Sequence, residues 1–164
     1  MAEEKKQAAF EIVVDDGSQR VPIKNMSGDE IGVFYFHPTD IGIIQRYNDA
    51  VAKFEEIVEP LEDAKIGADG TADISDEETA AALKEAERRL YEACDYIFGG
   101  NMAEAFFGKM HPFSPVGGVF YCESVLEKVG AFIAKQFEVE TAKISSRMEK
   151  YVGKYVGKNG KTKK

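Results

Sequence analysis

The segment from Ile97 to Gly108 constrains the fold most, because it places two Phe-Gly pairs around a very short helix-forming run. Glycine just after the last apolar residue of a helix is a typical C-cap, since glycine adopts positive φ without steric cost. Phe98-Gly99 therefore predicts the end of one helix, and Phe107-Gly108 predicts the end of the next. Between them, Asn101 and Glu104 have the spacing of a capping box. The segment predicts a tight helical corner.

The preceding part of the chain predicts a small antiparallel β-sheet of about three strands within residues 10–36. Two β-rich runs, Phe10–Val14 and Ile31–Phe36, flank a segment of alternating polarity at residues 21–24. Turn-forming residues separate the three runs, and Pro22 restricts the middle strand to an edge of the sheet. Such a sheet has one apolar face that another element must cover.

Three to four helices follow, and the last one is long. Residues 40–59 place apolar residues at helical spacing, and we expect this stripe to cover the sheet: Ile41, Ile44, Tyr47, Val51, Phe54 and Val58. Pro60 is expected to end or kink this helix. A capping box at Ser75 and Glu78 opens the next helix, and Ser114-Pro115 suits the start of the last one. The expected fold class is α+β, mainly α.

We expect one globular domain over residues 1–150, with a β region at 10–36 and a helical region at 39–150. A chain of 164 residues with 44% hydrophobic residues can bury a substantial core. Residues 151–164 hold a tandem Tyr-Val-Gly-Lys and a Lys-rich end, which predict a mobile basic tail.

The net charge of −8 is distributed unevenly along the chain. Residues 149–164 contain six lysines and one acid, so residues 1–148 carry a net charge of −13. An acidic body argues against a nucleic-acid partner, which requires clustered basic residues. No run approaches eighteen apolar residues, and the first residues lack the apolar core of a signal peptide. We expect no membrane partner and a location in the cytosol where the chain is made.

Candidate chemistry is sparse. His37 and His111 each stand beside a proline without neighbouring metal ligands, and Cys94 and Cys122 lie in apolar helical patterns that suggest buried thiols. The acidic loop at 67–78 does not fit a calcium loop, because Gly67 falls where the first carboxylate is needed and Ala72 where glycine is needed. An acidic run at residues 55–63 indicates a solvated helix face. We expect no enzyme activity, no catalytic residue, no metal and no cofactor.

Aromatic side chains crowd the region around the short helix. Many of them belong to the core, but an excess would leave an apolar patch that marks a site for a protein partner. The candidate partner-binding residues are Phe106, Phe107, Phe113, Phe120 and Tyr121.

The order of these elements resembles the tail assembly chaperones of long-tailed, siphovirus-type phages and prophages of Gram-positive bacteria. The shared pattern is a short β region, a helix that ends in Phe-Gly, a small helix that ends in a second Phe-Gly, and a long aromatic helix with a Lys-rich end. The likeness also takes in Phe36-His37-Pro38 and a helix beginning near Asp40 that contains Arg46-Tyr47-Asn48. It covers most of residues 10–150.

The resemblance implies a non-catalytic chaperone that binds the tape measure protein, keeps it soluble and helps recruit tail tube subunits. Tape measure protein and tail tube protein are the implied partners, and self-association is left open. The implied location is the cytoplasm of the bacterial host, with the protein absent from the mature virion. The alternative is a structural virion component such as a head–tail connector or a tail tube protein, which the predominance of helix disfavours.

Overall fold

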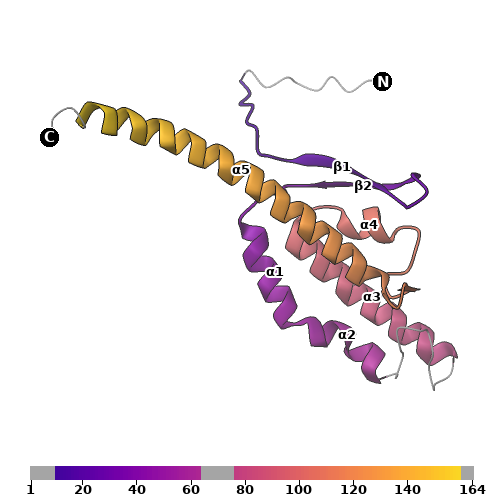
Figure 1. Ribbon diagram of the computed structural model, residues 1–164. Coiled ribbons are helices and arrows are strands. Elements are labelled where there is room, and N and C mark those ends of the chain that lie inside the picture. Colours follow the sequence, from indigo (N-terminus) through magenta and orange to yellow (C-terminus); the bar gives the residue numbers. More distant parts are fainter. Residues whose placement is uncertain (1–9, 64–75, 160–164) are drawn as a thin grey trace.

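The computed structural model describes residues 10–63 and 76–159, with side chains described up to Lys150. Figure 1 shows a β-hairpin above a group of helices and one long helix that crosses them and extends beyond them. The elements in chain order are β1 (Gln19–Lys24), β2 (Glu30–Phe36), α1 (Gly42–Ala52), α2 (Phe54–Asp63), α3 (Asp76–Phe98), α4 (Met102–Phe107), β3 (Pro115–Val116), β4 (Val119–Phe120) and α5 (Tyr121–Asn159). This arrangement confirms the predicted α+β, mainly α fold class.

The N-terminal sheet has two strands, so the prediction of three was wrong. β1 pairs antiparallel with β2, with Val21 opposite Phe34. Residues 10–14 pair with no strand, and their apolar side chains are at least 72% exposed. Asp15 and Asp16 accept the N–H groups of Gly17 and Ser18, but the chain does not fold back there to pair with β1. Instead, the Asp16 carboxylate lies 2.8 Å from Nε2 of His37, just after β2.

The apolar face of the hairpin is covered by α4, which lies between β2 and α3 (Figure 1). Phe34 stacks on Phe36 with ring centroids 3.9 Å apart, and the ring of Phe34 also meets those of Phe98 and Phe106 edge-on. Edge-on and offset aromatic contacts of this kind add stability beyond the area that they bury. The centre of the core is therefore an aromatic cluster shared by β2, α3 and α4.

Two glycines allow backbones to approach closely in this core. A Cβ at Gly32 on β2 would lie 2.2 Å from the carbonyl oxygen of Ala105 on α4. A Cβ at Gly100 would lie equally close, at 2.2 Å, to the carbonyl oxygen of Tyr35. No side chain larger than hydrogen fits at either position without a shift of the backbone. β2 is therefore held between α4 and the α3–α4 corner by backbone contact.

The corner between α3 and α4 forms where the Phe-Gly pairs predicted it, with different capping. Gly99 adopts φ 63° and ends α3 as expected, whereas Gly108 after α4 has a right-handed φ of −64°. Asn101 makes no side-chain cap for α4, so the predicted capping box was wrong. Its amide instead accepts the N–H of Tyr35 and donates to the carbonyl of Val33, both at 2.8 Å. Asn101 thereby pairs with β2 as a neighbouring strand would.

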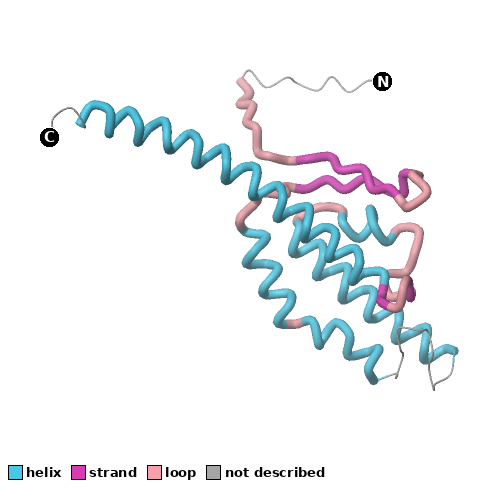
Figure 2. The backbone as a smooth tube through the Cα atoms, in the orientation of Figure 1, coloured by secondary structure: helices cyan, strands magenta, loops and turns pink. Residues whose placement is uncertain are grey.

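The helix predicted over residues 40–59 is two helices, α1 and α2, separated at Lys53. Figure 2 shows the break as a short loop between them. Pro60 lies inside α2 and does not end it. The two helices pack on α3, and the prediction that their stripe covers the sheet was wrong. α4 already fills the apolar face of β2, so the buried residues Ile43, Ile57 and Leu61 meet α3 instead.

The last helix begins later and ends later than predicted. Residues 115–120 form a small hairpin, β3–β4, in which Gly117 and Gly118 both have positive φ. Two such residues in a two-residue loop are typical of a type I′ turn, so the N-cap prediction at Ser114-Pro115 was wrong. α5 continues to Asn159, beyond the predicted boundary at 150. Ser75 of the other predicted capping box lies outside the described residues.

We predict that Gly32→Ala destabilises the protein by about 1–3 kcal/mol, because the added methyl group must displace the backbone of α4. Gly130→Ala is the matched control, since a Cβ at Gly130 meets no atom within 4 Å. In the control, replacing a helical glycine should raise the free energy of unfolding by up to about 1 kcal/mol. Chemical denaturation measures both values. Equal stability of the two variants would contradict the close approach of β2 and α4.

We predict that Asn101→Ala lowers the free energy of unfolding by about 1–3 kcal/mol, because the N–H of Tyr35 and the carbonyl of Val33 both lose their partner. Asn101→Asp keeps the acceptor for Tyr35 but places a carboxylate oxygen against the carbonyl of Val33, so it should also lose stability. Asn48→Ala, at an exposed position on α1, is the control and should be close to neutral. An Asn101→Ala variant as stable as the control would contradict the inference that Asn101 stabilises β2 as a neighbouring strand would.

Candidate functional site

An apolar stripe lies exposed along α1 and the start of α2. Five residues form this stripe, which we call the α1 stripe: Ile41, Ile44, Tyr47, Val51 and Phe54. Their exposed fractions are 77%, 51%, 46%, 52% and 38%, in that order. Their three- and four-residue spacing places them along one side of these helices. Contiguous exposed apolar residues of this kind commonly mark a site for another protein.

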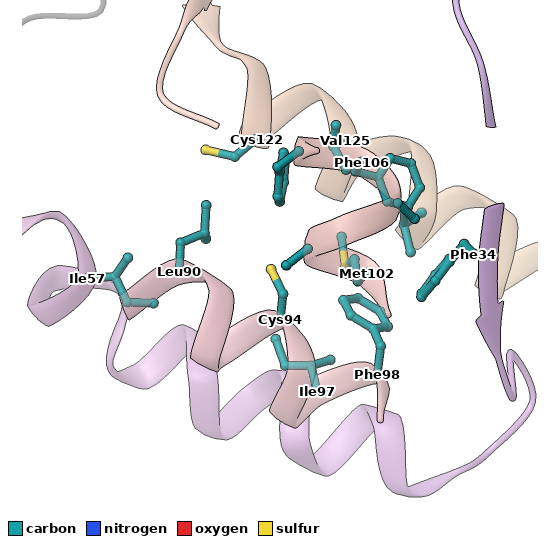
Figure 3. Close-up of a cluster of buried hydrophobic side chains, with 14 of the residues drawn as sticks. Phe34, Ile57, Leu90, Cys94, Ile97, Phe98, Met102, Phe106, Cys122 and Val125 are labelled. Atoms are coloured by element: carbon teal, nitrogen blue, oxygen red, sulfur yellow. The ribbon is translucent and has the colours of Figure 1, made fainter. Parts of the chain in front are cut away.

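The α1 stripe borders an apolar groove of about 230 Å³. Tyr47, Val51 and Phe54 form one wall, and Leu126 of α5 lines the groove from the opposite helix. The floor comes from α3, through Leu90, Cys94 and Ile97. Figure 3 shows Leu90 and Cys94 projecting from α3 into the space beside α5. The groove is smaller than a usual small-molecule pocket of roughly 300–1,000 Å³, so it suits apolar side chains that project from a peptide or helix.

Polar contacts hold α1 against α3 on the other side of the stripe. Nε of Arg46 donates to the carbonyl of Ile97 at 2.8 Å, which satisfies one of the last carbonyls of α3. The same guanidinium contacts the Asp40 carboxylate at 2.9 Å. Arg46 holds the pKa of Asp40 below its usual value. The start of α1 is therefore fixed to the end of α3, and this fixes the direction of the α1 stripe.

A second contact holds α2. Pro60 has no N–H, so the carbonyl of Glu56, four residues earlier, has no helical partner. The guanidinium of Arg89 on α3 donates to this carbonyl. Arg89 also contacts the carboxylates of Glu59 and Glu85. The proline thus leaves an acceptor on α2 that the helix itself cannot satisfy, and α3 supplies the donor.

A larger space of about 630 Å³ lies on the other side of α1, and it is a less suitable site. Its lining includes charged residues that already have partners, among them Arg89 and Asp49, the latter 3.4 Å from the Tyr96 hydroxyl. Burying such groups against a partner would cost desolvation energy. We therefore take the apolar groove as the candidate site.

The predicted partner-binding aromatics divide into two groups. Phe106, Phe107 and Phe113 are buried, with exposed fractions of 9%, 4% and 4%. Phe120 and Tyr121 are half-buried, and the Tyr121 hydroxyl donates to the carbonyl of Phe106 at 3.0 Å. Three of the five aromatics thus lie in the core, where a partner reaches none of them, and a binding role stays a prediction for Phe120 and Tyr121.

The residues considered for chemistry have structural contacts. His37 pairs with Asp16, and His111 lies 2.9 Å from Glu87 while its Nδ1 accepts the N–H of Phe113. Within residues 10–63 and 76–159, no group of three or more His, Cys, Asp or Glu side chains could hold a metal ion. The loop at Gly67 and Ala72 lies outside the described residues.

Comparison with known proteins found no matching family model, no similar curated protein and no similar solved structure. In the described part of the chain, no helix is both long enough and apolar enough to cross a membrane.

We predict that Cys94 and Cys122 react with a thiol reagent only slowly in the native protein. Both are buried, and burial raises the pKa of each to about 12. Since the thiolate is the reactive form, a shift of this size from an ordinary pKa near 8.5 reduces the reactive fraction at neutral pH by about three orders of magnitude. Absorbance of the released thiol product measures the rate with and without denaturant.

The same shift predicts a pH dependence of stability. The folded-state pKa of each thiol exceeds its unfolded value, so the contribution to stability is present below pH 9 and decreases as the pH rises from about 9 toward 12. A Cys94→Ala/Cys122→Ala variant should show a smaller decrease. Thiols that react as fast in the native protein as in the unfolded protein would contradict the burial of Cys94 and Cys122.

Proposed function

We propose that this protein is a non-catalytic phage tail assembly chaperone that binds apolar helical segments of a tape measure protein. It keeps that protein soluble in the host cytoplasm, helps recruit tail tube subunits and is absent from the mature virion. The observation that carries the binding role is the exposed α1 stripe beside an apolar groove. The order of the elements, with the Phe-Gly corner between α3 and α4, supports the choice of family.

The shape of the site suits an amphipathic helix as the client. An amphipathic helix binds a hydrophobic groove through apolar side chains at three- and four-residue spacing. The α1 stripe has that same spacing, and the groove beside it accepts side chains of modest size. A tape measure protein is a long helical chain rich in such faces. The contact surface in this proposal is therefore the α1 stripe, with Phe120 and Tyr121 as an additional half-buried patch.

The charge of the surface around the groove suits a chaperone. Five acids on α2 are exposed, and α2 carries no basic residue: Glu55, Glu56, Glu59, Glu62 and Asp63. A strong net charge keeps a complex with an apolar client soluble. It also gives the site an electrostatic preference for clients with basic flanks.

Co-expression with tape measure fragments tests the proposal. The wild-type protein should keep the fragments soluble and copurify with them. Val51→Asp should weaken binding by on the order of 1–3 kcal/mol, because it places a charge in the α1 stripe. Gln45→Asp is the matched control, since it adds the same charge at an exposed position of α1 outside the stripe.

Thermal melting separates binding from folding. Val51 is 52% exposed, so Val51→Asp should leave the melting temperature close to that of the wild type. Phe113→Ala, in the core, should instead lose about 3–5 kcal/mol of stability. Full client binding by a folded Val51→Asp variant would show that the client binds outside the α1 stripe. A wild-type protein that neither binds nor solubilises the tape measure would overturn the chaperone proposal.

A further inference from the structure

The distal half of α5 has no partner in the described structure. α5 contains 39 residues, and its buried side chains lie in the first part, at Cys122, Val125 and Val129. Every residue from Thr141 to Lys150 is exposed. Figure 1 shows this part of the helix extending past α1 and away from the other helices.

Two stripes run side by side along this distal half. Phe137, Ile144 and Met148 recur at seven- and four-residue spacing and form an apolar stripe, in which Phe137 is half-buried and Ile144 and Met148 are 55% and 53% exposed. The exposed side chains of Lys143, Arg147 and Lys150 recur at four- and three-residue spacing and form a basic stripe directly beside it.

The basic stripe is available for a new contact. Nζ of Lys143 lies 3.2 Å from a carboxylate oxygen of Glu140, one turn earlier, and both side chains are largely exposed. An exposed pair of this kind contributes little stability, at most about 1 kcal/mol, and is readily exchanged.

The groove on the body has the complementary properties. Its walls are apolar, and the helices that form them carry exposed acids, among them Glu55 on α2 and Glu127 on α5. The acidic helix α2 extends the negative surface along the groove.

Geometry and charge disfavour two simpler arrangements. The distal half does not lie on the groove of its own chain, because α5 is one continuous helix that leads away from it (Figure 1). Two distal halves packed antiparallel through their apolar stripes would bring their basic stripes to the same side, where like charges repel. The acidic groove of another copy satisfies both the apolar and the basic stripe.

We propose that the distal half of α5, from Phe137 to Asn159, docks in the apolar groove of a second copy of this chain, with its basic stripe against Glu55, Glu127 and the acidic face of α2. In this proposal the exchange of helices is reciprocal, which closes the contact into a two-fold symmetric dimer rather than an open chain. This contact does not rest on the proposed function, although it uses the same groove. In such a dimer a client helix competes with the neighbouring copy for the groove.

Light scattering coupled to size-exclusion chromatography, and sedimentation over a range of concentrations, test the dimer with the full chain. The wild type should dimerise, and higher ionic strength should weaken the dimer because its charges are near the surface. Ile144→Glu/Met148→Glu and Val51→Asp should each raise the dissociation constant by roughly tenfold or more. Val139→Glu is the control, since Val139 is 44% exposed on the opposite side of α5, and it should leave the dimer intact.

A mixing experiment identifies the occupant of the groove. Ile144→Glu/Met148→Glu keeps an intact groove, and Val51→Asp keeps an intact distal helix. Each alone should be monomeric, whereas the mixture should form a heterodimer through the one intact helix and the one intact groove. Dimerisation of Val51→Asp alone would overturn the proposal in favour of another contact. A wild-type protein that stays monomeric at all concentrations would also overturn it.

The outcome is distinguishable from that of the client experiment. Soluble tape measure fragments bound to a monomeric wild-type protein would overturn the dimer and leave the chaperone proposal intact. If the wild type dimerises and the mixture of the two variants forms a heterodimer, but no tape measure fragment binds, the dimer proposal stands and the chaperone proposal is overturned. Titration of the dimer with a tape measure fragment adds a third measurement, because shared use of the groove requires the fragment to dissociate the dimer.

Discussion

The contact between the backbones of β2 and α4 is the constraint on which the rest of this fold depends. Gly32 and Gly100 remove the side chains that would keep β2 away from Ala105 and from the α3–α4 corner. At this distance Phe34 reaches both Phe98 and Phe106, and Asn101 reaches the backbone of β2. α4 thereby covers the apolar face of the hairpin, and the α1 stripe is left without a sheet to cover.

Features that depend on local chemistry were predicted well from the sequence. The end of α3 at Phe98 follows from the positive φ of Gly99, α4 ends at Phe107 as predicted although Gly108 keeps a right-handed φ, and the predominance of helix follows from apolar spacing. The break at Lys53 could not be predicted, because no proline or glycine stands beside it. Pro60 was expected to end or kink the helix but lies inside α2, where Arg89 satisfies the acceptor that Pro60 leaves open. The β3–β4 hairpin was missed because Ser114-Pro115 also suits a helix start, although the Gly117-Gly118 pair is a strong signal for a hairpin turn.

The candidate site shows a limit of pattern analysis. A stripe of apolar residues at helical spacing shows that a helix has an apolar side, but not which element covers that side. Tyr47 and Val51 were therefore assigned to the core, and Phe106, Phe107 and Phe113 to a binding surface. In the structure the first two are exposed and the other three are buried. Neither local pattern shows which side chains another element covers, and the position of α4 against β2 decides it.

The unequal packing along α5 gives this helix two regimes of local stability. From Cys122 to Val129 its backbone hydrogen bonds are shielded by the core, so they open only when much of the protein unfolds. From Thr141 to Lys150 every side chain is exposed, so in an isolated copy these bonds depend on helix propensity alone. Amide protons should therefore exchange with solvent on very different timescales at the two ends of one unbroken helix. Any molecule that covers the distal end would slow amide exchange there, and so reduce the difference in exchange rate between the two ends without changing the shape of the helix.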